Sequence, residues 1–298
     1  MRKRNRERRN ANAGEAIPGL LNDIFVTHIL KYEHFDDPAD LARLPAVSRV
    51  MRDAVAATGL RFEELGEMRA MDLGCLSAVQ RLERGGRLSR REYLGYAAAR
   101  GGHLKELKVL RADDCPWDED TCTSAAMGGH LEVLQWARAN GCPWDEKTCA
   151  EAAFRGYLEM LQWARANGCP WDEKTCAEAA FRGHLEVLQW LRASGCPWDE
   201  LTCAGAAEGG YLEVLQWAHA NGCPWNVTTC ACAAKGGHLE VLQWLRANGC
   251  PWDSNTCAGA AKGGYLEVLQ WARANSCPWD AMTCSEAAFG DGNLEAMQ

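Results

Sequence analysis

The sequence predicts an all-α protein, in which an α-solenoid of stacked helix-turn-helix repeats follows a small helical module. The main observation is a Cys-Pro-Trp triplet that recurs at a constant interval of 27 residues, at Cys115, Cys142, Cys169, Cys196, Cys223, Cys250 and Cys277. A unit of this length has room for two short helices and a tight turn. Residues 16–58 lack the period and have apolar clusters of a different rhythm, which indicates a separate module.

Residues 142–168 illustrate how one repeat is expected to fold. Pro143 restrains the residue before it to an extended conformation, and Asp145 is a good N-cap for a helix. Gly156 is expected to end this first helix, which we name helix A. A second helix, helix B, is expected to begin at Leu158 and to end at the Asn-Gly pair that closes the unit.

The cysteines and tryptophans of the repeat are interpreted as packing residues. Fourteen of the sixteen cysteines occupy two fixed slots of the unit. Equivalent residues of stacked helices lie about 8–10 Å apart, whereas the Cα atoms of a disulfide rarely exceed about 7 Å, so a column of equivalent cysteines cannot cross-link. Tyrosine alternates with histidine in the only recurring histidine slot, which disfavours zinc. We therefore expect no metal, no cofactor, and buried, reduced cysteines.

Composition and charge favour a folded protein that neither crosses a membrane nor binds nucleic acid. The chain has 298 residues, of which 47% are apolar and 24% charged, as in folded domains. No apolar run is long enough to cross a membrane, and none follows the basic N-terminus as in a signal peptide. We expect an intracellular monomer, cytoplasmic and/or nuclear, with no membrane contact. The net charge of −8 makes nucleic acid an unfavourable partner.

The recurring string Thr-Cys-Ala-x-Ala-Ala-x-x-Gly-His/Tyr-Leu-Glu-Val-Leu-Gln-Trp resembles the ankyrin repeat, most clearly at residues 179–188. The resemblance covers residues 88–298, where the last repeat stops inside its second helix. Each unit is six residues shorter than the usual 33, and the missing length comes from the region that normally forms a projecting hairpin. The resemblance implies a non-catalytic array that binds a protein partner. It leaves the exposed surface of helix A as the candidate binding surface.

Differences between the repeats identify the candidate partner-binding residues. The slots that vary are the pair after the helix A cap, the pair after the second cysteine and the pair after Ala-Ala. The candidates are Glu146, Lys147, Phe154, Arg155, Phe181, Arg182, Glu200, Leu201, Glu208, Lys235 and Lys262. Net charge is negative in the four units that begin at residues 115–196, positive in the next unit and zero in the one after it. The alternative is that these slots are unconstrained solvent positions.

Residues before the array divide into three segments. Residues 1–15 are expected to be a disordered basic tail, and residues 59–87 a linker with a degenerate capping repeat. Residues 16–58 resemble the F-box, although Asn22 and Met51 depart from its pattern. The resemblance implies docking onto the linker subunit of a cullin-type ubiquitin ligase. The matching positions assigned to docking are Leu21, Asp23, Ile29, Leu30, Leu41, Leu44, Val47 and Ser48.

Three functions remain open at this stage. The order of the modules favours a non-catalytic substrate receptor of a cullin-type ubiquitin ligase, in which the repeats bind the substrate. The alternative is a free-standing interaction scaffold with no link to ubiquitin. The third is an enzyme that uses a thiol, but Cys232, the one cysteine of the array outside the two slots, has no evident catalytic partner.

Overall fold

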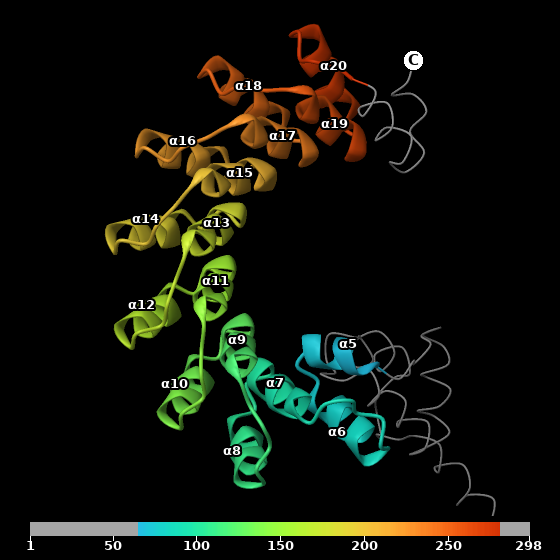
Figure 1. Ribbon diagram of the computed structural model, residues 1–298, viewed down its shortest axis with the longest axis vertical. Coiled ribbons are helices and arrows are strands. Elements are labelled where there is room, and N and C mark those ends of the chain that lie inside the picture. The colour runs from blue at the N-terminus through green and yellow to red at the C-terminus, as the bar shows by residue number, and fades with distance from the viewer. Residues whose placement is uncertain (1–64, 281–298) are drawn as a thin grey trace, which may run out of the picture. The chain divides into compact units, whose positions relative to one another are not determined.

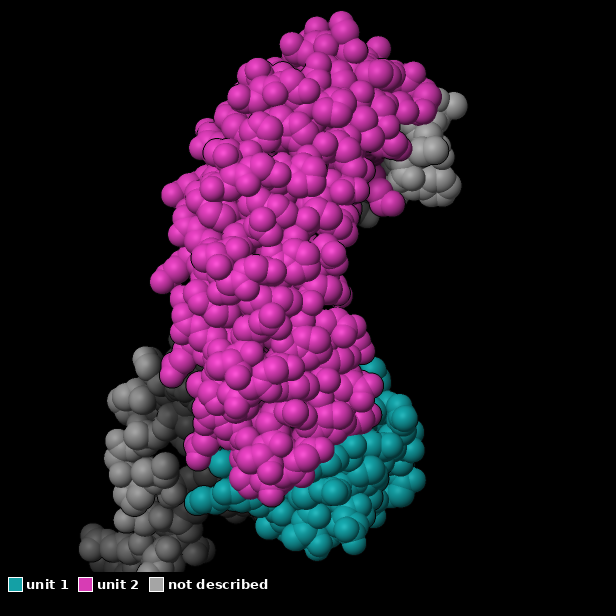
Figure 2. All heavy atoms as spheres, turned by 60° about the vertical axis from the view of Figure 1, so that its left-hand side comes forward, with its two compact units in different colours: residues 1–117 teal, residues 118–298 magenta. Residues whose placement is uncertain are grey.

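The computed structural model describes residues 65–280. They form helices α5 to α20 and no strand, which confirms the predicted all-α fold of stacked helix pairs. The chain divides into two compact units, residues 1–117 and 118–298, which are described separately (Figure 2). The basic tail, the F-box-like positions from Leu21 to Ser48 and the truncated last repeat lie outside the described residues.

The described part of the first unit consists of two helix pairs. They are α5 (Glu67–Asp72), α6 (Leu76–Arg84), α7 (Glu92–Arg100) and α8 (Leu104–Ala112). Leu94 of α7 and Leu107 of α8 are buried in its core. The backbone N–H and the hydroxyl of Ser89 donate hydrogen bonds of 2.8 and 2.7 Å to the Glu67 carboxylate. These bonds fix the start of α5 to the segment that leads into α7.

The described part of the second unit consists of six helix pairs (Figure 1). The first helices of the pairs are α9 (Glu119–Gly128), α11 (Glu146–Arg155), α13 (Glu173–Phe181), α15 (Glu200–Gly209), α17 (Val227–Lys235) and α19 (Ser254–Lys262). We name them the helix A row. The second helices are α10 (Leu131–Ala139), α12 (Leu158–Ala166), α14 (Leu185–Ala193), α16 (Leu212–Ala220), α18 (Leu239–Ala247) and α20 (Leu266–Ala274). We name them the helix B row; the rows lie on opposite sides of the unit.

The expected helix ends are confirmed in the repeat chosen from the sequence. The Asp145 side chain accepts a hydrogen bond of 3.1 Å from the Lys147 N–H, so it caps α11. Gly156 ends α11 in the left-handed conformation with φ +77°. Helix α12 then begins at Leu158.

Small buried side chains allow the helices of neighbouring repeats to approach closely. In α11, Cys149, Ala152 and Ala153 are all buried, and in α12 Leu161 and Ala164 are buried as well. The same slots are buried in each described repeat of the second unit. The core is therefore a continuous column of cysteine, alanine and leucine that runs between the two rows.

Cysteine thiols connect successive repeats. The thiol of each triplet cysteine donates a hydrogen bond to the N-cap carbonyl of the preceding repeat, as from Cys142 to Asp118 (3.3 Å) and from Cys223 to Asp199 (3.3 Å). The same thiol lies beside the second cysteine of that preceding repeat, so Cys122 pairs with Cys142. A hydrogen bond with Cys142, together with burial, raises the pKa of the Cys122 thiol. The buried Cys122 thiol is therefore a packing group and a poor nucleophile.

The recurring arginine of helix B has a structural role that the sequence did not indicate. The guanidinium of Arg192 lies 3.9 Å from the centre of the Trp198 ring. Its Nη1 also donates a hydrogen bond of 2.6 Å to the Cys196 carbonyl. Arg138 and Arg246 make the same two contacts in their repeats. The arginine thus holds the extended Cys-Pro-Trp segment against helix B.

Candidate partner-binding surface

The structure places all eleven predicted partner-binding residues on the helix A row or at its helix ends. Seven of them are exposed: Glu146, Lys147, Arg182, Glu200, Leu201, Lys235 and Lys262. Four are half-buried: Phe154, Arg155, Phe181 and Glu208. They come from α11, α13, α15, α17 and α19, so five successive repeats contribute to one surface.

An aromatic cluster occupies the part of this surface that belongs to α11 and α13. The rings of Phe154 and Phe181 are stacked, with centroids 6.3 Å apart. The guanidiniums of Arg182 and Arg155 lie 4.6 and 5.4 Å from the centre of the Phe154 ring. The four predicted residues therefore form one cluster with apolar faces and two cations.

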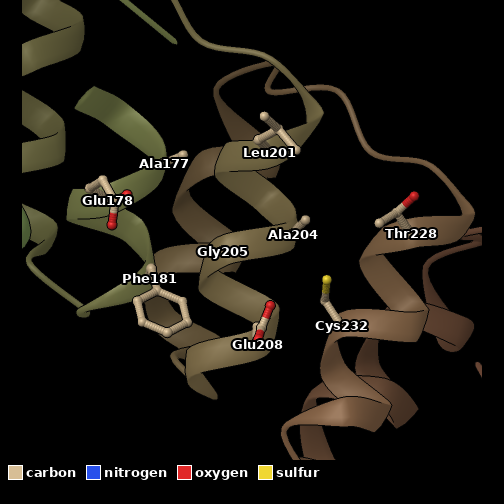
Figure 3. A pocket seen from close by; sticks show the side chains of 9 residues that line it. All are labelled: Ala177, Glu178, Phe181, Leu201, Ala204, Gly205, Glu208, Thr228 and Cys232. Carbon is tan, nitrogen blue, oxygen red and sulfur yellow. The ribbon is translucent and has the colours of Figure 1, made fainter. Parts of the chain in front are cut away.

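A hollow of about 380 Å³ lies next to this cluster, between α13, α15 and α17. Figure 3 shows its walls: Phe181 on α13, Leu201 and Glu208 on α15, and Cys232 on α17. Its remaining lining residues are Ala177, Glu178, Ala204, Gly205 and Thr228. Leu201 is 53% exposed, so its side chain is available to a partner.

A second hollow, of about 270 Å³, lies between α17 and α19. Lys235 and Lys262 line it, together with Thr228, Ala231, Cys232, Asn255, Ala258 and Gly259. Lys235 also donates a hydrogen bond of 2.8 Å to the Glu208 carboxylate across the boundary between α15 and α17. The predicted residues of this part of the surface are therefore basic, whereas Glu200 and Glu208 make α15 acidic.

Sequence reasoning missed several residues that shape the two hollows. The second position after the helix A cysteine reads Glu151, Glu178, Gly205, Cys232 and Gly259 in successive repeats. Gly205 lines the larger hollow, Gly259 lines the smaller one, and Cys232 lines both. This change from large to small side chains is visible in the sequence. Its effect on the surface depends on how closely the neighbouring helices pack, which the sequence does not give.

One cysteine, Cys232, lines both hollows of this surface. Burial and the neighbouring Glu208 carboxylate raise the pKa of Cys232 to about 11, so its thiol stays protonated at neutral pH. Within residues 65–280, no group of three or more His, Cys, Asp or Glu side chains is placed to hold a metal ion. No helix among those residues is long and apolar enough to cross a membrane.

One family model matches part of the array. Residues 203–246 match the family model described as ankyrin repeats (many copies). Among solved structures, the chain is similar to the crystal structure of the human ASB11 ankyrin repeat domain, with 20% identity and a TM-score of 0.42. That similarity covers 52% of this chain and 82% of the other. A search of curated proteins finds no match. The matched residues run from Cys203 in α15 to Arg246 in α18, and the ankyrin repeat that they match is typically a non-catalytic scaffold for binding proteins.

Proposed function

We propose that this chain is a non-catalytic adaptor, in which the helix A row of the second unit binds a protein substrate and residues 16–58 dock onto the linker subunit of a cullin-type ubiquitin ligase. The observation that carries the binding role is the gathering of all eleven candidate residues on one row of helices or at its helix ends. The support for the ligase role is the F-box-like pattern before the repeats. A free-standing scaffold is the alternative.

The binding role is tested by affinity capture with the full chain from a cell extract. Leu201→Asp, on the helix A row, is expected to lose the proteins that the wild type captures, because a charge replaces an exposed apolar contact. Gln216→Asp is the matched control, since Gln216 is exposed on α16 in the helix B row. Equal capture by both variants would contradict the assignment of the surface.

The ligase role is tested with the purified linker subunit. The full chain should recover it in a pull-down, and Leu44→Asp should not, because Leu44 matches an apolar position of the F-box pattern. Ala42→Asp places the same charge two residues earlier, outside the pattern, and should still recover the subunit. If the wild type recovers no linker subunit, the free-standing scaffold is the better description.

A further inference from the structure

We propose that the two hollows of the helix A row form one groove that binds an extended protein segment with a cationic side chain and a carboxylate about four residues apart. This inference rests on the proposed protein-binding function and adds the chemistry of the partner. The hollows are neighbours, because Thr228 and Cys232 line both of them. They belong to α13, α15, α17 and α19, so the groove crosses four successive repeats.

The larger hollow suits a long cationic side chain. Its lining combines apolar walls, Phe181 and Leu201, with two carboxylates, Glu178 and Glu208. Glu208 pairs with Lys235, whereas the nearest cation to Glu178 is Lys174 Nζ at 4.0 Å. Burial raises the pKa of Glu178, so this carboxylate gains from a further cation. The stem of a lysine or arginine can pack on the apolar walls while its head reaches Glu178.

The smaller hollow suits a carboxylate. Lys262 and Lys235 line it, and Lys235 also bonds the Glu208 carboxylate. The Asn255 amide, which donates one hydrogen bond to Asp253, and the Thr228 hydroxyl offer further donors. No acidic residue is among its lining side chains. The charge of the groove therefore changes sign between its two hollows, and a partner with charges of the opposite order is complementary to it.

The spacing of the hollows favours an extended segment. The larger hollow centres on α15, and the smaller one lies between α17 and α19. Helices pack about 8–10 Å apart, so the hollows are separated by roughly 12–15 Å. An extended chain rises about 3.3 Å per residue, so about four residues cover this distance. Residues i and i+4 of an extended chain also point to the same side, as the two hollows require.

A random 12-residue peptide library displayed on phage, panned on the full chain, tests the proposal. Enriched peptides are expected to share a Lys or Arg and an Asp or Glu about four residues apart. Synthetic copies should bind Thr228→Trp at least about tenfold more weakly than the wild type, because an exposed residue that lines both hollows becomes bulky. Gln216→Trp is the control, since Gln216 is exposed on α16 in the helix B row; it should change affinity less than about twofold.

Charge reversal provides the second readout. Panning on the Lys235→Glu, Lys262→Glu variant should select peptides without the acidic residue, provided that circular dichroism shows the variant is folded. The proposal is overturned if no peptide is enriched, if enriched peptides lack the charge pair, or if Thr228→Trp binds them as well as the wild type does. Lys147 is a predicted partner-binding residue that lines neither hollow. Binding lost in Lys147→Trp and kept in Thr228→Trp would overturn the groove but preserve the helix A row as the binding surface.

Discussion

The repeated and the variable residues of the second unit make different kinds of contact. Repeated residues connect one repeat with the next, as when the Cys142 thiol donates to the Asp118 carbonyl. Variable residues such as Leu201 and Lys235 are exposed on the helix A row. The difference shows that a stack can hold its geometry with one set of slots and change its surface with another. Substitutions in the two sets should therefore differ in their effect on stability.

The largest expected difference between repeated and variable residues is in the alkylation rate of their cysteine thiols. The fourteen other cysteines described are buried, so we expect them to react only after unfolding, whereas half-exposed Cys232 should react in the native state. Because burial raises the pKa of Cys232 to about 11, its rate should keep rising from pH 8 to pH 11 instead of levelling off near pH 8.5. Iodoacetamide labelling with peptide mass spectrometry measures this. Labelling of Cys203 as fast as Cys232 would contradict the comparison.

Truncation of a leucine should separate the two sets by free energy of unfolding. Leu188 is fully buried in α14, so Leu188→Ala should lower the stability by about 2–5 kcal/mol. Leu201→Ala is the matched change in a variable slot and should stay within about 0.5 kcal/mol of the wild type. Urea denaturation followed by circular dichroism compares them. A similar loss in both variants would show that Leu201 is part of the scaffold.

Two glycines with similar backbone conformations differ in whether they contact the next repeat, so substituting each one measures the effect of that contact on stability. Gly129 has φ +79°, and a Cβ there would lie 2.8 Å from the Tyr157 ring of the next repeat. Gly141 has φ +84°, with no atom within 4 Å of such a Cβ. Gly141→Ala should cost about 1–2 kcal/mol from backbone strain, and Gly129→Ala should cost about 1–3 kcal/mol more. Equal losses of thermal stability would mean that the tyrosine moves aside freely.

Arginine removal should have an intermediate effect. Arg192→Ala loses the stack on Trp198 and the hydrogen bond to the Cys196 carbonyl, and should lower stability by about 1–2 kcal/mol. His219 occupies the same slot and stacks on Trp225 at 3.6 Å. His219→Arg is therefore the reverse experiment and should be neutral or stabilising in thermal melting. If Arg192→Ala melts like the wild type, the arginine is only a solvated residue.

The smallest effect is expected for an exposed ion pair. Lys235 and Glu208 lie 2.8 Å apart, but the Lys235 side chain is 53% exposed. Lys235→Ala should change the free energy of unfolding by less than about 0.5 kcal/mol, because water and salt screen such pairs. Urea denaturation at low and high salt measures this change. A loss of more than about 1 kcal/mol would show that Lys235, a variable residue, stabilises the stack as the repeated residues do.

Local signals predicted much of the fold. Asp145 and Gly156 mark the ends of α11, and the structure places both at those ends, because capping depends on residues close in the chain. The partners of the repeated side chains were not predictable in the same way. The pairing of Cys122 with Cys142 joins two different slots of successive repeats, whereas sequence reasoning considered only columns of equivalent cysteines.

Part of the candidate surface was also accessible from sequence. Variation among repeats selected residues that all lie on the helix A row. The stack of Phe154 on Phe181 and the two hollows were not foreseen, because each depends on how neighbouring helices approach. Glycine at 205 is an example: its missing Cβ would lie 2.9 Å from the Ala177 carbonyl, so the residue lets α15 approach α13 closely.

The sequence by itself determined the repeat length, the helix ends and the division between constant and variable slots. These features depend on capping, turn chemistry and periodicity, which act over a few residues. Only the tertiary structure decided that the thiols bond to the preceding repeat and that Gly205, Cys232 and Gly259 shape two hollows of opposite charge. The reason is that these contacts join residues about one repeat or more apart, whose separation follows from helix packing rather than from local sequence.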